Sequence, residues 1–198
     1  MKKSLLLFAA ALGFATVSYA QTSYGLKAGV TFPNVKFSQS GLSVSPSSST
    51  SFYLTGYADV NIASNLSIQP GLSLQGKGYK ISDEGETFKQ DLMYLEVPVN
   101  FVYYVPAGSG NLFLGAGPYA AYGISSKTFF AGESESGSFD DAGLNAFDAG
   151  LNVLGGYKLA NGFLINAGYG IGLTNMGKDS GDAKAKNRVF SVGIGFQF

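Results

Sequence analysis

The sequence of 198 residues contains no cysteine, no histidine and no tryptophan. Without cysteine the chain forms no disulfide, and without histidine or cysteine it cannot build a Ser-His-Asp triad, a cysteine nucleophile or a typical zinc site. Charged residues are scarce as well, at 13%, and the 13 basic residues balance the 13 acidic ones, so no strong field draws the chain to nucleic acid. Carboxylate pairs, a Ser-Lys arrangement or a Tyr remain as options, but the acidic residues of the long loops do not match the spacing of a calcium loop. We expect no catalytic residue, no metal site and no cofactor.

Long apolar runs are absent except near the start of the chain. Lys2 and Lys3 precede an apolar run over residues 5–17, which is followed by Ser18-Tyr19-Ala20. This order is typical of a secretory signal peptide over residues 1–20 that is cleaved after Ala20. The alternative is an uncleaved helical anchor, but the run is short for a membrane-spanning helix, which takes about 20 residues. The remaining residues, 21–198, are enough for one domain.

Glycine and aromatic residues are abundant, with 28 Gly, 12 Tyr and 16 Phe, and the last twelve residues show how they are arranged. Apolar residues fall at every second position there, which gives a strand one apolar face. In a closed barrel inside a membrane, the strand edge is paired and the apolar face meets lipid. The alternative is an edge strand of a soluble sandwich, which would invite aggregation. The ending on Phe196 and Phe198 also resembles the insertion signal read by the bacterial barrel-assembly machinery.

Seven further segments alternate in the same way, and their connections differ in length. The eight predicted strands cover residues 24–32, 51–62, 66–79, 92–105, 111–124, 144–159, 163–174 and 187–198. Three connections are short (63–65, 106–110 and 160–162), and Asn161-Gly162 in the last is a tight-turn signal. The other four are long and polar (33–50, 80–91, 125–143 and 175–186). Short turns at one end and long loops at the other predict an all-β, eight-stranded antiparallel up-and-down transmembrane β-barrel. Pro70, Pro98 and Pro118 fall inside strands and predict bulges there.

Alternation alone does not say which face is inside, because a secreted lipocalin-like barrel also has eight strands but turns its apolar face inward. Its outer face would then need many charges. Here the face opposite the apolar one consists mostly of Gly, Ser, Thr, Asn and Tyr, which suits a lumen. We therefore expect the apolar residues to contact outer-membrane lipid.

An eight-stranded barrel is just wide enough for its own inward side chains. Tyrosines on strands 51–62, 66–79 and 92–105 are expected to lie against glycines on the opposite wall, which predicts a filled lumen. We also expect seven inward charges, which should pair or reach water because a lone buried charge costs several kcal/mol. The expected pairs are Lys27 with Asp59 and Lys77 with Glu96, and Lys158 has no obvious partner. The full lumen charge network is Lys27, Asp59, Lys77, Glu96, Asp148, Lys158 and Arg188.

Several short motifs resemble one family when they are taken in order. They are YLEVPV at 94–99, GAGPY at 115–119, FDAGL at 147–151, YGIGLTN at 169–175 and the closing Phe198. Together they resemble the outer-membrane β-barrel domain proteins, often called porin family proteins, that are common in Bacteroidetes. The resemblance implies an eight-stranded barrel in the outer membrane of a Gram-negative bacterium. It implies no general activity and no catalytic residues.

Four functions remain open at this point. The leading hypothesis is a non-enzymatic structural or surface-interaction protein that uses its four long loops, because loops on a rigid scaffold commonly carry binding. The alternatives are a narrow channel for water or small ions, a membrane enzyme acting on lipid, and a secreted ligand-binding barrel. The expected partners are outer-membrane lipid, the barrel-assembly machinery through the terminal strand, and an extracellular partner that the sequence does not identify.

Overall fold

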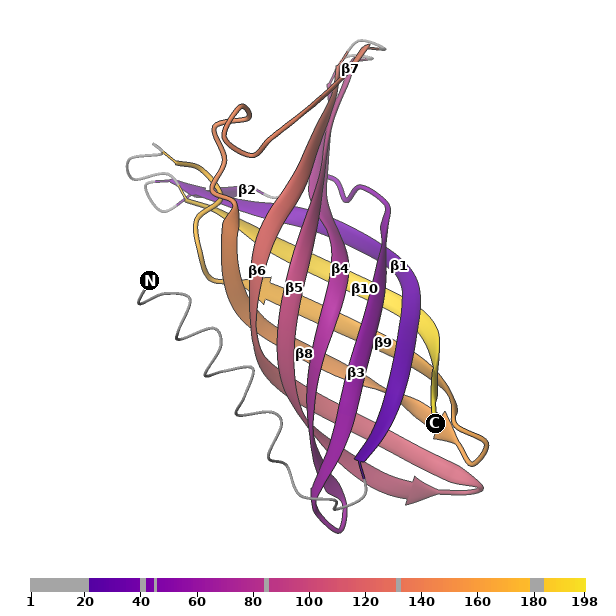
Figure 1. Ribbon diagram of the computed structural model, residues 1–198. Helices are drawn as coiled ribbons and strands as arrows, with labels where there is room; N and C mark the ends of the chain where they lie inside the picture. Colours follow the sequence, from indigo (N-terminus) through magenta and orange to yellow (C-terminus); the bar gives the residue numbers. More distant parts are fainter. Residues whose placement is uncertain (1–21, 40–41, 45, 84–85, 131–132, 179–183) are drawn as a thin grey trace, which may run out of the picture.

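The computed structural model describes residues 22–39, 42–44, 46–83, 86–130, 133–178 and 184–198. These residues form a single antiparallel sheet joined by turns and loops (Figure 1). Within these ranges no helix is both long enough and apolar enough to cross a membrane. The expected signal peptide over residues 1–20, with its cleavage after Ala20, lies outside the described residues.

The sheet contains ten strands, which we label in chain order. They are β1 (Thr22–Gln39), β2 (Leu42–Val44), β3 (Ser51–Ala63), β4 (Leu66–Asp83), β5 (Glu86–Ala107), β6 (Gly110–Phe130), β7 (Glu133–Gly137), β8 (Phe147–Leu159), β9 (Phe163–Gly172) and β10 (Lys184–Gln197).

Eight of these strands close into a ring. The short strands β2 and β7 lie outside the ring, and each pairs with one strand, β2 with β1 and β7 with β6. The other eight follow the order β10-β9-β8-β6-β5-β4-β3-β1. The ring closes because β10 also pairs with β1, from Gly25 opposite Gln197 to Ser38 opposite Lys184. The predicted eight-stranded antiparallel up-and-down barrel is therefore confirmed, and each predicted strand corresponds to one strand of the ring.

The short connections all lie at the end of the barrel where β1 begins and β10 ends (Figure 1). They join β3 to β4, β5 to β6 and β8 to β9. Gly108 and Gly162 hold φ angles of 60° and 90° in the second and third of these turns. This left-handed conformation suits glycine, which has no Cβ to clash. The amide of Phe163 donates to the side chain of Asn161 at 3.1 Å, so the Asn-Gly turn forms as predicted.

The orientation of the strands also agrees with the prediction. Leu95, Val97 and Phe196 are 40%, 48% and 46% exposed, whereas Tyr57 and Glu96 are only 7% and 5% exposed. The apolar stripe of each strand therefore faces outward and the polar stripe lines the interior. In water such an outer wall would be a large aggregation surface, but in a bilayer it contacts hydrocarbon.

The strands run further at the other end than the sequence predicted. Residues 80–91, expected as a loop, mostly continue β4 and β5 as a hairpin, and β6 continues to Phe130 and pairs with β7. β5 and β6 have 22 and 21 residues, about twice the 9–11 that cross a bilayer. They project as a narrow extension above the ring (Figure 1). The polar composition of these segments predicts loops, but paired strands in water tolerate polar side chains on both faces.

Pro33 marks a second difference, because β1 passes through it instead of ending there. Beyond Thr31 the strand no longer pairs with β3, and only β10 pairs with it until β2 joins at Phe37. Proline removes one backbone donor, so it is tolerated where a strand has lost one neighbour. The carbonyl of Pro33 still accepts a hydrogen bond from the Ser49 amide at 3.1 Å.

The three interior prolines do not produce the predicted bulges. The β4–β5 register continues without a shift from Pro70 opposite Val99 to Ser73 opposite Glu96. The register shifts lie elsewhere, between Asn61 and Ala63 and between Met93 and Tyr94. Each proline therefore removes one backbone hydrogen-bond donor from its strand, but the strand register does not shift.

Candidate functional site in the barrel lumen

The lumen is filled by large residues that lie against glycines. Tyr53, Tyr57 and Tyr119 are buried in it. A Cβ on Gly25 would collide with the ring of Tyr57, and one on Gly193 would collide with the hydroxyl of Tyr53. The interior therefore fits together as bulky rings on some strands and bare backbone on others. This is the packing that the sequence predicted for a narrow barrel.

A charge cluster lies inside the lumen near the residue where β8 begins. We call it the central cluster and define it as Lys77, Glu96 and Asp148. Lys77 Nζ lies 3.1 Å from Glu96 Oε2 and 2.9 Å from Asp148 Oδ2. All three residues are buried, at 2%, 5% and 2% exposure. The ammonium also lies 4.2 Å from the centroid of the Tyr119 ring. One cation thus links β4 to its neighbour β5 and, across the lumen, to β8.

Hydrogen bonds satisfy the two carboxylates of the central cluster. Asn152 donates to Glu96 Oε1 at 3.1 Å. Asp148 accepts from three further donors: the Tyr119 hydroxyl at 3.2 Å, Asn187 Nδ2 at 3.0 Å and the Thr174 hydroxyl at 2.5 Å. Because two carboxylates share one ammonium, the cluster carries a net charge of −1. These neutral donors help to hold the excess charge away from water.

A second cluster lies nearer the short turns, and we call it the periplasmic cluster: Lys27, Asp59 and Lys158. Asp59 Oδ2 accepts from Gln69 Nε2 at 2.7 Å and from the hydroxyl of Tyr104. Lys158 Nζ lies 4.6 Å from the centroid of the Tyr104 ring. The sequence predicted no partner for Lys158. In the structure its ammonium faces the ring of Tyr104, whose hydroxyl donates to Asp59.

The expected ion pair between Lys27 and Asp59 does not form, which corrects the sequence prediction. Lys27 Nζ lies instead over the ring of Tyr57, 4.2 Å from its centroid. Thr55 is opposite Lys27 and Ser23 is opposite Asp59, so Tyr57 is the inward residue between them. Its ring occupies the space that an ion pair would need, and the carboxylate is already bonded to Gln69 and Tyr104.

Arg188 is also misplaced by the sequence prediction, because it does not face the lumen. Its neighbours Asn187 and Val189 are buried inside, at 1% and 3% exposure, and alternation turns Arg188 to the outer wall with Phe190. Its Nη1 donates to the carbonyls of Gly172 and Asn187 at 2.8 Å and 3.0 Å. The lumen network therefore contains six of the seven expected charges.

A small polar cavity remains between the two clusters. Its volume is about 90 Å³, and its lining includes Lys27, Tyr53, Lys77, Glu96 and Asn166. A space of this size and polarity accommodates a few water molecules.

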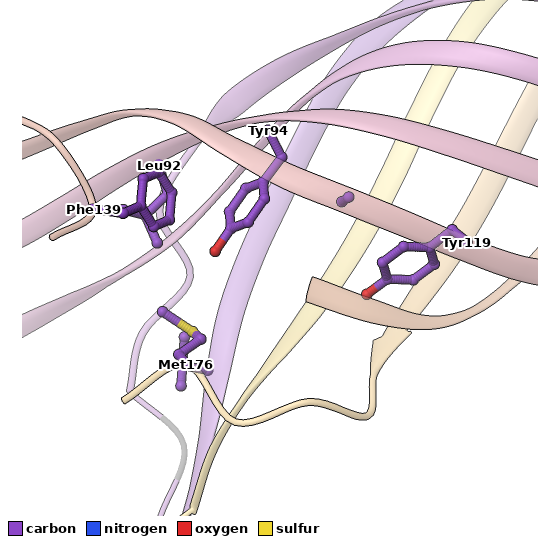
Figure 2. Close-up of a cluster of buried hydrophobic side chains, with 7 residues drawn as sticks. Leu92, Tyr94, Tyr119, Phe139 and Met176 are labelled. Atoms are coloured by element: carbon purple, nitrogen blue, oxygen red, sulfur yellow. The ribbon is translucent and has the colours of Figure 1, made fainter. Parts of the chain in front are cut away.

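The outer mouth of the lumen is closed by an apolar plug. Phe139 and Met176, from the two segments that flank β8 and β9, are 3% and 4% exposed and pack with inward residues of the wall (Figure 2). The Phe139 ring meets Tyr94 edge-on, with centroids 5.0 Å apart and planes at 73°. It also fills the space beside Gly123. The plug consists of Phe139, Met176, Val35, Leu92, Tyr94, Tyr119 and Ala121. It contacts the central cluster through Tyr94 and Tyr119, whose ring centroids lie 4.9 Å and 4.2 Å from Lys77 Nζ.

Backbone and side-chain bonds hold the two plug segments together. Asn145 Nδ2 donates to the carbonyls of Asn175 and Gly177 at 3.0 Å and 3.1 Å. Next to Phe139, the hydroxyl and amide of Ser138 donate to Asp141 Oδ2 at 2.7 Å and 2.9 Å, and these bonds lower the pKa of Asp141. The plug is therefore part of a folded cap.

Sequence reasoning missed the plug and the donors that cross the lumen. Asn187 and Tyr119 lie on strands and have the inward parity, so alternation alone could have placed them in the lumen. Phe139, Thr174 and Met176 lie outside the strands, and no sequence pattern indicates that they turn inward. Within the described ranges, no group of three Asp or Glu residues could hold a metal ion.

The fold agrees with the comparison to known families. The model of the family "outer membrane protein beta-barrel domain" matches residues 19–177. The chain belongs to this family. It is therefore an outer-membrane β-barrel protein of a Gram-negative bacterium. No curated protein matches the chain.

Similar solved structures are outer-membrane barrels of about the same length. Neisserial surface protein A is 17% identical, with 90% of this chain and 99% of that chain covered and a TM-score of 0.49. OprG of Pseudomonas aeruginosa is 14% identical, with 90% and 97% covered and a TM-score of 0.48. Ail, the attachment invasion locus protein of Yersinia pestis, is 16% identical, with 89% and 97% covered and a TM-score of 0.44. At these values we transfer no role from them.

Proposed function

We propose that this protein is a non-enzymatic barrel that acts as a structural or surface-interaction protein of the outer membrane. The observation that carries the proposal is the closed lumen. Two charge clusters and an apolar plug fill it, and the cavity left between the clusters has a volume of only about 90 Å³. A barrel filled in this way offers its outer surface for contact, and its function then lies in the parts that project from the membrane.

The extension formed by β4, β5, β6 and β7 is the surface best placed for such contact. About ten residues of β5 and of β6 remain after a span of 9–11 residues has crossed the bilayer, and at about 3.4 Å each they reach about 30 Å beyond it. Exposed residues there include both apolar and acidic side chains: Ile81, Phe130, Glu133 and Glu135. A rigid hairpin presents such groups with less loss of conformational entropy than a flexible loop does.

Export and assembly form part of the same proposal. Residues 1–20 would direct the chain across the inner membrane and be removed after Ala20. The terminal strand would then be recognised by the barrel-assembly machinery. Phe196 is exposed on the outer wall opposite Leu26, and Phe198 is 69% exposed while its amide and carbonyl bond to Tyr24 at 2.8 Å and 3.0 Å. Before the ring closes, the edge of β10 and both phenylalanines would be free to be bound.

A narrow channel is the second candidate, and the polar cavity between the clusters favours it. Water or a proton could reach this cavity if the plug moved aside. Conductance of the full chain in planar bilayers separates the two functions. The structural proposal predicts no steady conductance for the native chain, and none for Phe139→Ala, because Lys77, Glu96 and Asp148 still fill the lumen below the plug.

A steady pore in the native chain would contradict the structural proposal. A pore that appears only in Phe139→Ala would identify the plug as a gate and favour the channel. Gly56→Ala is the matched control, because a Cβ there points to the outer wall and makes only an ordinary contact with Leu26, at 3.5 Å. It should behave as the native chain does.

A further inference from the structure

Three cations face outward on the seam between β1 and β10, and we call them the basic patch: Lys36, Lys186 and Arg188. Their inward neighbours Val35, Asn187 and Val189 are buried at 0–3% exposure, so alternation turns the patch to the outer wall. Lys36 is exposed, and Lys186 and Arg188 are half-buried. Lys184, the next outward position on β10, is exposed and extends the patch away from the membrane.

The patch lies just beyond the aromatic end of the lipid-facing wall. Phe32 on β1 and Phe190 on β10 are cross-strand partners and stack with centroids 6.2 Å apart. Aromatic residues of this kind mark the interface of membrane barrels. Arg188 is two residues beyond Phe190 and Lys36 four beyond Phe32, or about 7 Å and 14 Å along the strand and about 5 Å and 10 Å in height at a tilt of about 40°. The headgroup layer of one leaflet is about 5–8 Å thick, so Arg188 lies within it and Lys36 just above it, where its long side chain can reach back to the headgroups.

The cations of the patch repel one another without an acidic partner. Lys36 and Lys186 are directly opposite in the β1–β10 register, and like charges in this position are destabilising. Among the described residues none of the three is within ion-pair distance of a carboxylate; Arg188 bonds only to the two carbonyls already named. The arrangement therefore leaves room for an anion from outside the chain.

The extension on the opposite side of the barrel also contains lysines on facing strands, but there a carboxylate lies beside them. Lys80 and Lys89 are also cross-strand partners on β4 and β5. There, Lys89 Nζ lies 2.5 Å from Asp91 Oδ2, and Asp91 is opposite Lys127 on β6. Lys80, Lys89 and Lys127 thus provide a set of three cations near the outer end with a carboxylate among them.

We propose that the basic patch binds the phosphate groups of a phosphorylated glycolipid in the outer leaflet, with the acyl chains of that lipid against Phe32 and Phe190. The charge is complementary, the height matches the headgroup layer, and the aromatic pair provides the apolar contact below it. A basic residue near an anionic membrane surface contributes about fivefold in affinity. The inference goes beyond the proposed function and does not depend on whether the lumen conducts.

The test uses the full refolded chain in dodecylmaltoside micelles, titrated with diphosphorylated lipid A and followed by native mass spectrometry. Dephosphorylated lipid A with the same acyl chains is the reference lipid. We expect the native chain to bind the phosphorylated lipid at least tenfold more tightly than the reference. The triple variant Lys36→Gln, Lys186→Gln, Arg188→Gln should lose this preference. The matched control Lys80→Gln, Lys89→Gln, Lys127→Gln removes the same charge and should keep it.

Equal binding of the two lipids by the native chain, or an equal loss in both triple variants, would overturn the proposal. Inorganic phosphate at millimolar concentration should not displace the lipid; full displacement would show a site for free phosphate and contradict the assignment to a lipid. A heat-dependent shift in gel mobility reports folding of each variant. If the triple variant does not fold, Lys36→Gln alone carries the test, with an expected loss of about fivefold.

Discussion

The central and periplasmic clusters lie in the same lumen and contain the same types of residue, yet they stabilise their charges in different ways. In the central cluster one lysine lies between two carboxylates, both within 3.1 Å. In the periplasmic cluster both lysines lie over tyrosine rings, and the single carboxylate accepts from neutral donors. The comparison shows that a buried charge in this barrel needs partners, but that the partner need not be an opposite charge.

The difference follows from what stands between the charges. Tyr57 separates Lys27 from Asp59, so the cation takes the ring face, which attracts it through the quadrupole of the ring. Lys77 reaches Asp148 on β8 beside Tyr119, whose ring fits against Gly150, also on β8. Gly150 therefore makes room for the tyrosine that donates to Asp148 in the central cluster.

Removing one lysine from each cluster should give the largest contrast. Lys77→Met leaves Glu96 and Asp148 buried without their cation, so we expect a loss of about 3–5 kcal/mol in the free energy of unfolding. Lys27→Met removes a cation that has no carboxylate at ion-pair distance, and we expect a loss of under about 2 kcal/mol. Urea unfolding in lipid vesicles, followed by gel mobility, measures both. Equal losses would show that the clusters do not differ.

Replacing the glycine that packs against a lumen tyrosine, Gly150 against Tyr119 or Gly25 against Tyr57, should give the next largest difference in stability. A Cβ on Gly150 would collide with the Ile171 carbonyl as well as the Tyr119 ring, whereas a Cβ on Gly25 would meet the Tyr57 ring. We expect Gly150→Ala to cost about 3 kcal/mol, since backbone must shift, and Gly25→Ala about 1 kcal/mol, since a ring can turn. The same unfolding assay gives the order. The reverse order would place the tighter packing in the periplasmic cluster.

Removing one tyrosine hydroxyl that donates to a carboxylate of each cluster should have a smaller effect. Tyr104→Phe leaves Asp59 with Gln69 as its donor, and we expect a loss of about 2 kcal/mol. Tyr119→Phe should cost about 1 kcal/mol or less, because Asp148 keeps Lys77, Asn187 and Thr174. Measured losses that are the same within error would mean that the number of remaining donors does not matter.

An ion pair on the surface should contribute less to the free energy of unfolding than any contact in the two clusters. Lys178 pairs with Asp140 at the surface of the cap, where both side chains are exposed. Lys178→Gln should lower the free energy of unfolding by under about 1 kcal/mol, because solvent screens the pair. A loss as large as that of Lys77→Met would show that burial is not what makes the central cluster important.

The sequence predicted the ring of strands and the identity of their faces, because alternation with period two is a local property. Alternation also placed Lys77 and Glu96 on the inward faces of two adjacent strands. It did not predict contacts across the lumen, such as those of Lys77 and Asn187 with Asp148, because these depend on the closure of the ring.

The cap was beyond sequence reasoning as well. Phe139 and Met176 lie in segments without a period, and what places them in the lumen is the space left by Gly123 and the apolar walls around it. Arg188 could have been assigned correctly, since it shares the parity of Phe190. The sequence did not predict the strand extensions because their polar composition is typical of loops, although cross-strand pairing such as that of Asp91 with Lys127 sustains a sheet in water.

The central claim is that hydrocarbon contacts the apolar stripe while the lumen is closed to lipid and bulk water. The chain has no native cysteine, so single cysteines at Leu54 and Thr55, and at Val192 and Ser191, can carry a nitroxide label on opposite faces of two strands. In vesicles, collision rates with oxygen dissolved in the bilayer and with a water-soluble nickel chelate report the surroundings of each label. The account predicts high oxygen and low nickel collision at Leu54 and Val192, and low values of both at Thr55 and Ser191. High oxygen collision at Thr55 and Ser191, with low values at Leu54 and Val192, would contradict it.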